Sequence, residues 1–372
     1  MNRYHRQMIL PDIGMRGQRA IHDAHVCIAG CGALGCCSAE LLARAGVGKI
    51  TLIDRDVVEE TNLQRQILFT ESDATNAIPK AEAAKVRLAK INSETTIEAH
   101  VEDLDASNIT HLLGSADVLV DGLDNFQSRY LLNDFAVHEG RAYLYGGAVG
   151  ATGLAMPILP HPEARAQANN AVARWTNSDS TPCLRCLFPE PPSPGSTPTC
   201  DTAGVLAPIV MIIASYQVTE AIKILTGNFE QLDRSLLSIN LWSNVTHRTN
   251  TSNARNETSC PCCALGHFDF LNRQREQVAS SFCGRQAVQI WPTQGPVSEV
   301  AVDVDLDVLL SQLAPHGDFR TNGHLIHGCF KEERGETDDP IQLLLFANGR
   351  AVIGGTSQPA RARTVYARYV GM

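Results

Sequence analysis

The sequence lacks an excess of positive charge: 31 Lys and Arg residues stand against 40 Asp and Glu residues, a formal net charge of −9. A protein that binds nucleic acid regardless of its sequence needs a basic surface, so this composition argues against that class. It still permits a nucleotide site, because one triphosphate needs only a few local cations. We therefore expect no nucleic-acid partner.

Long apolar runs are also missing. The longest, Val205–Tyr216, contains Pro208 and is shorter than the roughly 20 residues that cross a bilayer. The first residues include Arg3 and Arg6 instead of the apolar stretch of a secretory leader. We therefore expect a cytoplasmic protein with no membrane association. In that compartment the twelve cysteines are metal ligands, nucleophiles or small buried residues rather than a disulfide framework.

The length of 372 residues favours two domains. Residues 24–158 alternate apolar runs with amphipathic segments, which predicts βαβ units and a largely parallel sheet covered by helices on both faces. The strand-like runs are Ala24–Ala29, Lys49–Asp54, Thr96–Val101, Ala116–Asp121 and Arg141–Tyr145. The helical patterns between them are Leu34–Ala45, Lys80–Ile91, Ser107–Leu113 and Gln127–Glu139.

A long irregular stretch follows at about residues 160–203, rich in Pro, Ser, Thr and Asn. A stretch of this length without periodicity is usually functional or mobile, and we interpret it as a crossover loop. A helix is expected over about 205–225, ended by Gly227, and then two strands near 236–241 and 245–248.

The predicted organisation is an α/β domain with a Rossmann-like, doubly wound, mostly parallel sheet over residues 1–270. A linker follows at 271–280, and then a small α+β domain at 281–372. The turn Asn348-Gly349 suits a hairpin in this second domain. Its expected strands are 287–291, 324–330, 341–346 and 351–353, and its expected helices are 306–313 and 360–369.

A glycine-rich loop after the first strand is the first candidate binding element. Small residues there let backbone N–H groups and the start of a helix approach a phosphate. Asp54, at the end of the next strand, is placed to hold a ribose hydroxyl. The loop alone predicts only a nucleotide-binding fold, and a tight turn without a ligand is the alternative. Its small residues are Gly30, Gly32, Ala33 and Gly35.

Polar and charged residues follow the other strands. Loops at the carboxyl ends of parallel strands gather around one crevice, so we expect Arg65, Lys80 and Asp124 to converge there. Two cations and an acid suit a triphosphate with Mg²⁺, whereas hydride transfer has no use for that set. The candidate residues are Asn62, Gln64, Arg65, Lys80, Asp124 and Asn125.

These motifs together resemble the ThiF/MoeB/HesA family of ubiquitin-activating-like adenylyltransferases, over about residues 3–270. The resemblance implies ATP-dependent adenylylation of the C-terminal glycine carboxylate of a ubiquitin-like sulfur carrier of the ThiS or MoaD class. Such a carrier ends in Gly-Gly. With a pKa of about 3.5 its carboxylate is already ionised, so no general base is needed. The matching runs are Arg3–Gln7, Gly30–Gly35, Asp54–Asp56, Asn62–Gln66, Pro79–Lys80 and Asp121–Asn125.

The resemblance also implies individual roles. Asp54 matches a ribose-binding residue, and Asp124 matches the essential acid that binds Mg²⁺. Arg6 matches an arginine supplied by the partner subunit, which implies a homodimer. Ala33 departs from the common glycine, but contact through the backbone survives that change. The positions that match phosphate-binding residues are Asn62, Arg65 and Lys80.

Two C-x-x-C pairs predict a zinc site: Cys183 with Cys186, and Cys260 with Cys263. Four thiolates make a closed tetrahedral site, which is structural because no position is open to water. The family places its zinc ligands at the same points. Because Cys262 stands between them, the sequence leaves open which cysteines of the second pair bind zinc. The C-x-x-C spacing favours Cys260 and Cys263.

Cys200 immediately precedes a predicted helix, where a thiol can have a depressed pKa. In some members of the family the matching cysteine forms a thioester or acyl-disulfide with the carrier, and in others it is dispensable. Both readings of Cys200 stay open. The C-terminal residues 281–372 resemble a small α+β domain appended to some bacterial ThiF-like proteins, and the sequence does not specify the role of this domain.

Three alternatives to carrier adenylylation are considered. An NAD-dependent oxidoreductase would leave Arg65, Lys80 and Asp124 without a role, and a non-catalytic scaffold would not need the full residue set. Within the family, the substrate is alternatively a peptide or a modified tRNA base. The two cysteine pairs favour a sulfur carrier over the tRNA.

Overall fold

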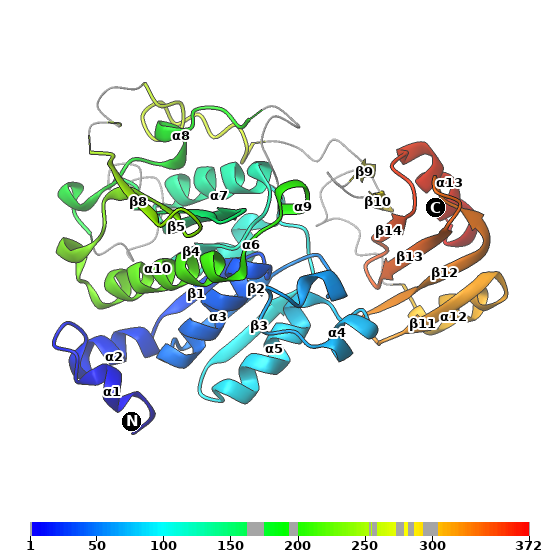
Figure 1. Ribbon diagram of the computed structural model, residues 1–372, viewed down its shortest axis with the longest axis horizontal. Helices are drawn as coiled ribbons and strands as arrows, with labels where there is room; N and C mark the ends of the chain where they lie inside the picture. The colour runs from blue at the N-terminus through cyan, green and yellow to red at the C-terminus, as the bar shows by residue number, and fades with distance from the viewer. Residues whose placement is uncertain are drawn as a thin grey trace. The chain divides into compact units, whose positions relative to one another are not determined.

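The computed structural model describes residues 2–161, 175–192, 200–252, 254, 259–272, 279–281, 286–292 and 304–371. The chain forms two compact units (Figure 1). Unit 1 consists of Met1–Thr75 and Pro79–Arg273, and unit 2 of Asn76–Ile78 and Gln274–Met372.

Unit 1 contains an eight-stranded sheet in the order β3-β2-β1-β4-β5-β6-β7-β8. The strands from β3 to β5 are parallel, and β6, β7 and β8 continue the sheet as antiparallel strands. Strand order reverses direction between β1 and β4, which is where α/β sheets open a ligand crevice at the strands' carboxyl ends. The strands are β1 His25–Ala29, β2 Lys49–Ile53, β3 Thr96–His100, β4 Val118–Asp121, β5 Ala142–Val149, β6 Thr152–Ile158, β7 Ser235–Asn240 and β8 Val245–Asn250.

Helices cover both faces of this sheet. Figure 1 shows α3, α5 and α10 on one side and α7 on the other. Two apolar cores result, one between α3, α10 and β6, and one that joins α6 and α7 to the opposite face. The long helices are α3 Ala33–Ala45, α5 Lys80–Ile91, α7 Phe126–Glu139 and α10 Ala207–Thr226. The shorter ones are α1 His5–Met8, α2 Gly14–His22, α4 Glu71–Thr75, α6 Ile109–Leu113, α8 Leu184–Leu187 and α9 Cys200–Ala203.

The predicted α/β alternation is confirmed, with element ends within a few residues of those expected. The strand β6 was not predicted from the sequence, since its small residues have low strand propensity. This strand exists because Gly150, at φ 61°, closes a hairpin that pairs it with β5 along its whole length. The two N-terminal helices α1 and α2 were not predicted either.

The helix α10 matches the helix expected over about 205–225 to within two residues. It is the one described helix long and apolar enough to cross a membrane, and 56% of its most apolar window is buried inside the protein. Packing against α3, β5 and β6 accounts for this composition. Pro208 lies in its first turn, and Gly227 ends it with φ 80°.

Unit 2 is a six-stranded antiparallel sheet in the order β11-β12-β13-β14-β10-β9. The helices α12 Leu306–Leu313 and α13 Pro359–Tyr369 pack on one apolar core with it. The expected Asn348-Gly349 turn joins β13 and β14, with Gly349 at φ 77°. The strands are β9 Ala279–Ser281, β10 Ala287–Ile290, β11 Gly317–Thr321, β12 Leu325–Arg334, β13 Pro340–Phe346 and β14 Ala351–Gly354. Of these, β9 and β11 were not expected.

Candidate nucleotide site and cysteine cluster

The glycine-rich loop joins β1 to α3 and lies against the end of β4. Gly30 has φ 90°, and a Cβ built there would come within 2.6 Å of the Gly122 carbonyl oxygen. A Cβ on Gly35 would lie 1.9 Å from the Gly30 oxygen, so neither position has room for a side chain. Gly32 is the N-cap of α3, and among the described residues no side chain caps this helix. The N–H groups of its first turn, starting at Ala33, are therefore available to a phosphate.

Asp54 lies directly beside this loop. Its carboxylate accepts hydrogen bonds from the backbone N–H groups of Cys31 and Asp56, both at 2.7 Å. Burial raises the pKa of Asp54 above its ordinary value, and the charge of Lys80 opposes that shift. The carboxylate is thus anchored at the mouth of the loop, at the position expected for a ribose-binding acid.

Lys80 begins α5 and is 5% exposed. Its Nζ lies 3.1 Å from Asp56 Oδ2. Burial alone would lower the pKa of Lys80, but Asp56, Asp54 and Asp124 outweigh it and raise that pKa, so the side chain stays charged. The sequence predicted no separate role for Asp56, whereas in the structure it is the ion-pair partner of Lys80.

Asp124 is exposed, and Asn125 Nδ2 lies 3.4 Å from its Oδ1. Its charge raises the pKa of Lys80 and also that of Arg55, so it lies near both. Asn125 caps α7 by accepting a hydrogen bond from the Ser128 N–H at 2.8 Å. The structure therefore brings Asp54, Lys80 and Asp124 together around the glycine loop.

In the described part of the chain no hydrogen bond or ion pair joins the remaining predicted residues to this group, so the convergence of Arg65 with Lys80 and Asp124 stays a prediction. Asn62 is 1% exposed and accepts a hydrogen bond from the Glu59 N–H at 3.1 Å, which holds its own loop together. Gln64 is exposed. Arg65 donates to the Thr61 carbonyl at 2.9 Å, so in this structure it contacts its own loop. Arg6, in α1, is exposed.

The donor set fits a nucleoside triphosphate. The glycine loop packs closely against the backbone of Gly122, the start of α3 offers N–H groups, and Lys80 supplies a buried positive charge. The exposed carboxylate of Asp124 is the kind of ligand that Mg²⁺ prefers.

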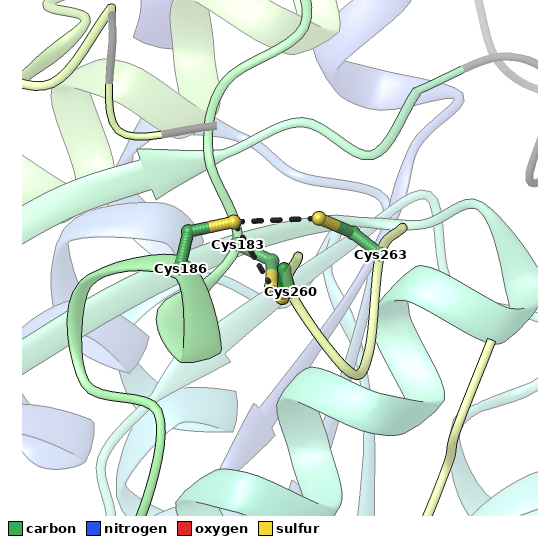
Figure 2. Close-up of side chains that lie close together, drawn as sticks. All are labelled: Cys183, Cys186, Cys260 and Cys263. Carbon is green, nitrogen blue, oxygen red and sulfur yellow. Dashed lines mark hydrogen bonds between the residues drawn. The ribbon is translucent and has the colours of Figure 1, made fainter. Parts of the chain in front are cut away.

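The four cysteines form a compact cluster, and Figure 2 shows their side chains directed toward a common centre. Their sulfur atoms all lie within 4.8 Å of one another. Individual Sγ–Sγ distances are 3.8 Å for Cys183–Cys186, 3.6 Å for Cys183–Cys260 and 3.3 Å for Cys186–Cys263. Thiolates about 2.3 Å from a tetrahedral zinc ion would lie about 3.8 Å apart, so the cluster fits Zn²⁺.

Cys262 lies outside the cluster. Its sulfur accepts a hydrogen bond from Asn133 Nδ2 at 3.5 Å. Asn133 Oδ1 also accepts from the Leu184 N–H at 2.8 Å, and Asp134 Oδ2 accepts from the Phe270 N–H at 3.0 Å. Side chains in the buried middle of α7 thus bind the chain segments that carry the two cysteine pairs. Sequence reasoning missed Asn133 and Asp134, although two polar residues inside an apolar helical run were a signal.

Cys200 is the first residue of the short helix α9, which was not expected, and the predicted helix begins further along the chain, at Ala207 in α10. Its side chain lies outside the described part of the structure. Residues 162–174 and 193–199 of the predicted crossover also lie outside the described residues.

Comparison with known protein families gives one match over most of the chain. The model of the ThiF family matches residues 4–262. "Sulfur carrier protein ThiS adenylyltransferase" from Bacillus subtilis is 39% identical over 370 residues, which are 99% of each chain. "SAMP-activating enzyme E1" from Haloferax volcanii is 34% identical over 73% of this chain and 92% of its own. "Sulfur carrier protein adenylyltransferase" from Thermus thermophilus is 35% identical over 76% and 97%.

Solved structures agree at the level of the fold. The crystal structure of MccB from E. coli superposes with a TM-score of 0.55 and 23% identity, over 74% of each chain. At that identity the similarity shows a shared fold and says nothing about the substrate.

Proposed function

The chain belongs to the ThiF family, and we propose that it uses ATP to adenylylate the C-terminal carboxylate of a small ubiquitin-like sulfur-carrier protein. The observation that carries this proposal is the 39% identity to a ThiS adenylyltransferase along 99% of both chains, which includes unit 2 as well as unit 1. Two further relatives are named for activating a sulfur carrier or a SAMP protein. The chain is therefore an adenylyltransferase, and the proposed carrier is of the ThiS or MoaD class.

The chemistry requires positioning more than proton transfer. A carboxylate oxygen of the carrier forms a bond to the α-phosphorus of ATP, the bond from that phosphorus to the bridging oxygen breaks, and pyrophosphate leaves with the electron pair. The carboxylate is ionised at neutral pH, since its pKa is about 3.5. What remains is alignment and the neutralisation of charge on the phosphates.

The chain's own residues suit these tasks. The first turn of α3 and the Gly30 loop offer backbone N–H groups to the phosphates, and Lys80 adds a permanent positive charge. Asp54 would hold the ribose from its anchored position beside the loop. Asp124 would bind Mg²⁺, which supplies charge neutralisation at the phosphates when bound. Asn62, Gln64 and Arg65 complete the phosphate side in this proposal.

The proposal includes a structural Zn²⁺ at the four cysteines, a homodimer and a cytoplasmic location. Arg6 is exposed and has no contact with Lys80 or Asp124 among the described residues, which suits a side chain that serves the neighbouring subunit. Transfer of the activated carrier to Cys200 would be a separate later step, in which the thiolate attacks the acyl carbon and AMP leaves. Adenylylation does not need it.

Carrier-dependent ATP–pyrophosphate exchange tests the proposal. The purified protein is incubated with ATP, labelled pyrophosphate and a ThiS-class carrier ending in Gly-Gly, with the same carrier lacking its last glycine as control. We expect exchange only with the complete carrier, and Asp124→Ala should lower it by about 100-fold or more. Turnover of NAD without exchange, or the absence of exchange with ThiS-class and MoaD-class carriers, would contradict the proposal.

A further inference from the structure

Asp121 is a buried carboxylate at the carboxyl end of β4 that the chemistry above does not use. It is 0% exposed. Arg129 Nε lies 3.3 Å from its Oδ2, and the Tyr143 hydroxyl donates to the same oxygen at 2.7 Å. Burying such a pair costs desolvation energy, and an apolar replacement is often at least as stable. The pair therefore calls for a reason beyond stability.

The same pair holds both peptide groups around Leu123, the residue before Asp124. Asp121 Oδ1 accepts a hydrogen bond from the Leu123 N–H at 2.9 Å. Arg129 Nη2 donates to the Leu123 carbonyl at 2.6 Å and to the Gly146 carbonyl at 3.1 Å. The turn that follows β4 is thereby tied to α7 and to the neighbouring strand β5.

Asp124 has little else to fix it. Its side chain is exposed, and the 3.4 Å contact from Asn125 Nδ2 is long for a hydrogen bond. Its direction is therefore set by the backbone on either side. Arg129 can hold that backbone firmly, because its guanidinium lies between the rings of Phe126 and Tyr145, 5.9 and 5.7 Å from their centroids.

We propose that Asp121 and Arg129 are positioning residues for adenylylation, which hold the turn that presents Asp124 to the triphosphate and its metal ion. This inference rests on the proposed function, because it assigns the pair to the same site. Neither residue needs to touch the substrate, since misplacing a catalytic group by about 1 Å can lower a rate by about 100-fold.

Arg129→Lys is the informative variant, because lysine keeps the charge beside Asp121 but lacks the planar fork that reaches Asp121 and Leu123 together. We expect kcat for carrier-dependent exchange to fall by about 10- to 100-fold, with the KM for ATP within about twofold of wild type. The Mg²⁺ concentration that gives half the maximal rate should rise. Tyr143→Phe removes one hydrogen bond to Asp121 and should give a smaller loss in the same direction.

The matched control is Arg141→Lys, which changes another buried arginine at the opposite end of the sheet. Arg141 is 4% exposed, precedes β5 and donates to the Gly114 carbonyl at 2.5 Å. We expect this variant to keep the wild-type kcat and Mg²⁺ requirement, so that loss of any buried arginine does not explain the effect.

A double-mutant cycle decides whether Arg129 acts through Asp124. In an Asp124→Asn background, Arg129→Lys should have no further effect on kcat, because the group it positions is already lost. Additive losses overturn the inference, as does an Arg129→Lys protein with wild-type kcat and Mg²⁺ requirement. If Arg129→Lys does not fold in a thermal melt, Tyr143→Phe takes its place in the same cycle. A wild-type protein without carrier-dependent exchange would instead overturn the proposed function.

Discussion

At the scale of single residues, Lys80 shows how a buried charge is kept. Burial would lower its pKa and favour the neutral amine, which could not neutralise phosphate. Asp56 and Asp54 reverse that shift, and Asp124 contributes in the same direction. These acids therefore keep Lys80 charged, which the proposed phosphate binding would require.

The burial of His25 leads to a prediction about how the folding stability depends on pH. It is buried at the start of β1, with Nε2 2.8 Å from Thr51 Oγ1 and Nδ1 3.2 Å from Ser115 Oγ. Burial, and then the nearby charge of Lys49, lower the pKa of His25 from its ordinary 6.5. The unfolded chain therefore takes up the proton more readily than the folded one. The stability that the fold gains from burying a neutral His25 is therefore complete above about pH 6.5. It is lost as the pH falls through the folded-state pKa of His25.

We expect the Tm, measured by calorimetry, to fall between about pH 7 and pH 5, and to fall less steeply in His25→Gln. His111→Gln is the control, since His111 is exposed and should leave the slope unchanged. Equal slopes for wild type and His25→Gln would contradict this account.

At the scale of elements, α7 joins two parts of unit 1. Its start carries Asn125 and Arg129 beside the nucleotide site, and its middle carries Asn133 and Asp134 beside the cysteine cluster. A helix keeps residues at a fixed spacing, so both groups are placed by one rigid body. The helix α7 therefore couples the position of the cysteine cluster to that of the candidate nucleotide site.

The contacts of α7 lead to a prediction about zinc. Asn133→Ala removes the side chain that holds the Leu184 N–H beside the first cysteine pair, and should weaken zinc binding by about 10- to 100-fold, as loss of outer-shell partners typically does. Competition with a chromogenic chelator measures this. Cys262→Ser should retain one zinc per chain, whereas Cys263→Ser should not. If the two cysteine variants retain zinc equally, the assignment of Cys263, and not Cys262, as the fourth zinc ligand is wrong.

At the scale of the whole molecule, each unit has a core of its own. The cysteine cluster belongs to unit 1 and joins segments separated by 77 residues along the chain. A metal that closes such a loop stabilises the unit that contains it.

We therefore expect calorimetry of the full chain to show two unfolding transitions. Removal of zinc with a chelator should lower the Tm of the unit 1 transition and leave that of unit 2 unchanged. Restoring zinc should reverse the shift. A single transition, or an equal shift of both, would show that the two units unfold as one.

Local patterns in the sequence were enough to predict much of this protein. The alternation of strand and helix periods predicted the α/β sheet, and Gly30, Gly32 and Gly35 indicated the loop between β1 and α3, whose binding of phosphate stays a prediction. The C-x-x-C spacing predicted which thiols would meet. In each of these cases the signal lies within a few neighbouring residues, so it can be read without knowing what packs against them.

Other features depend on contacts between residues far apart in the chain, and only the tertiary structure decided them. Asn133 donates a hydrogen bond to Cys262 across 129 positions, and Tyr143 donates one to Asp121 across 22. The pairing of Lys80 with Asp56 and the strand β6 likewise depend on neighbours in space. Burial makes such contacts strong, and burial is a property of the folded chain that no short stretch of sequence contains.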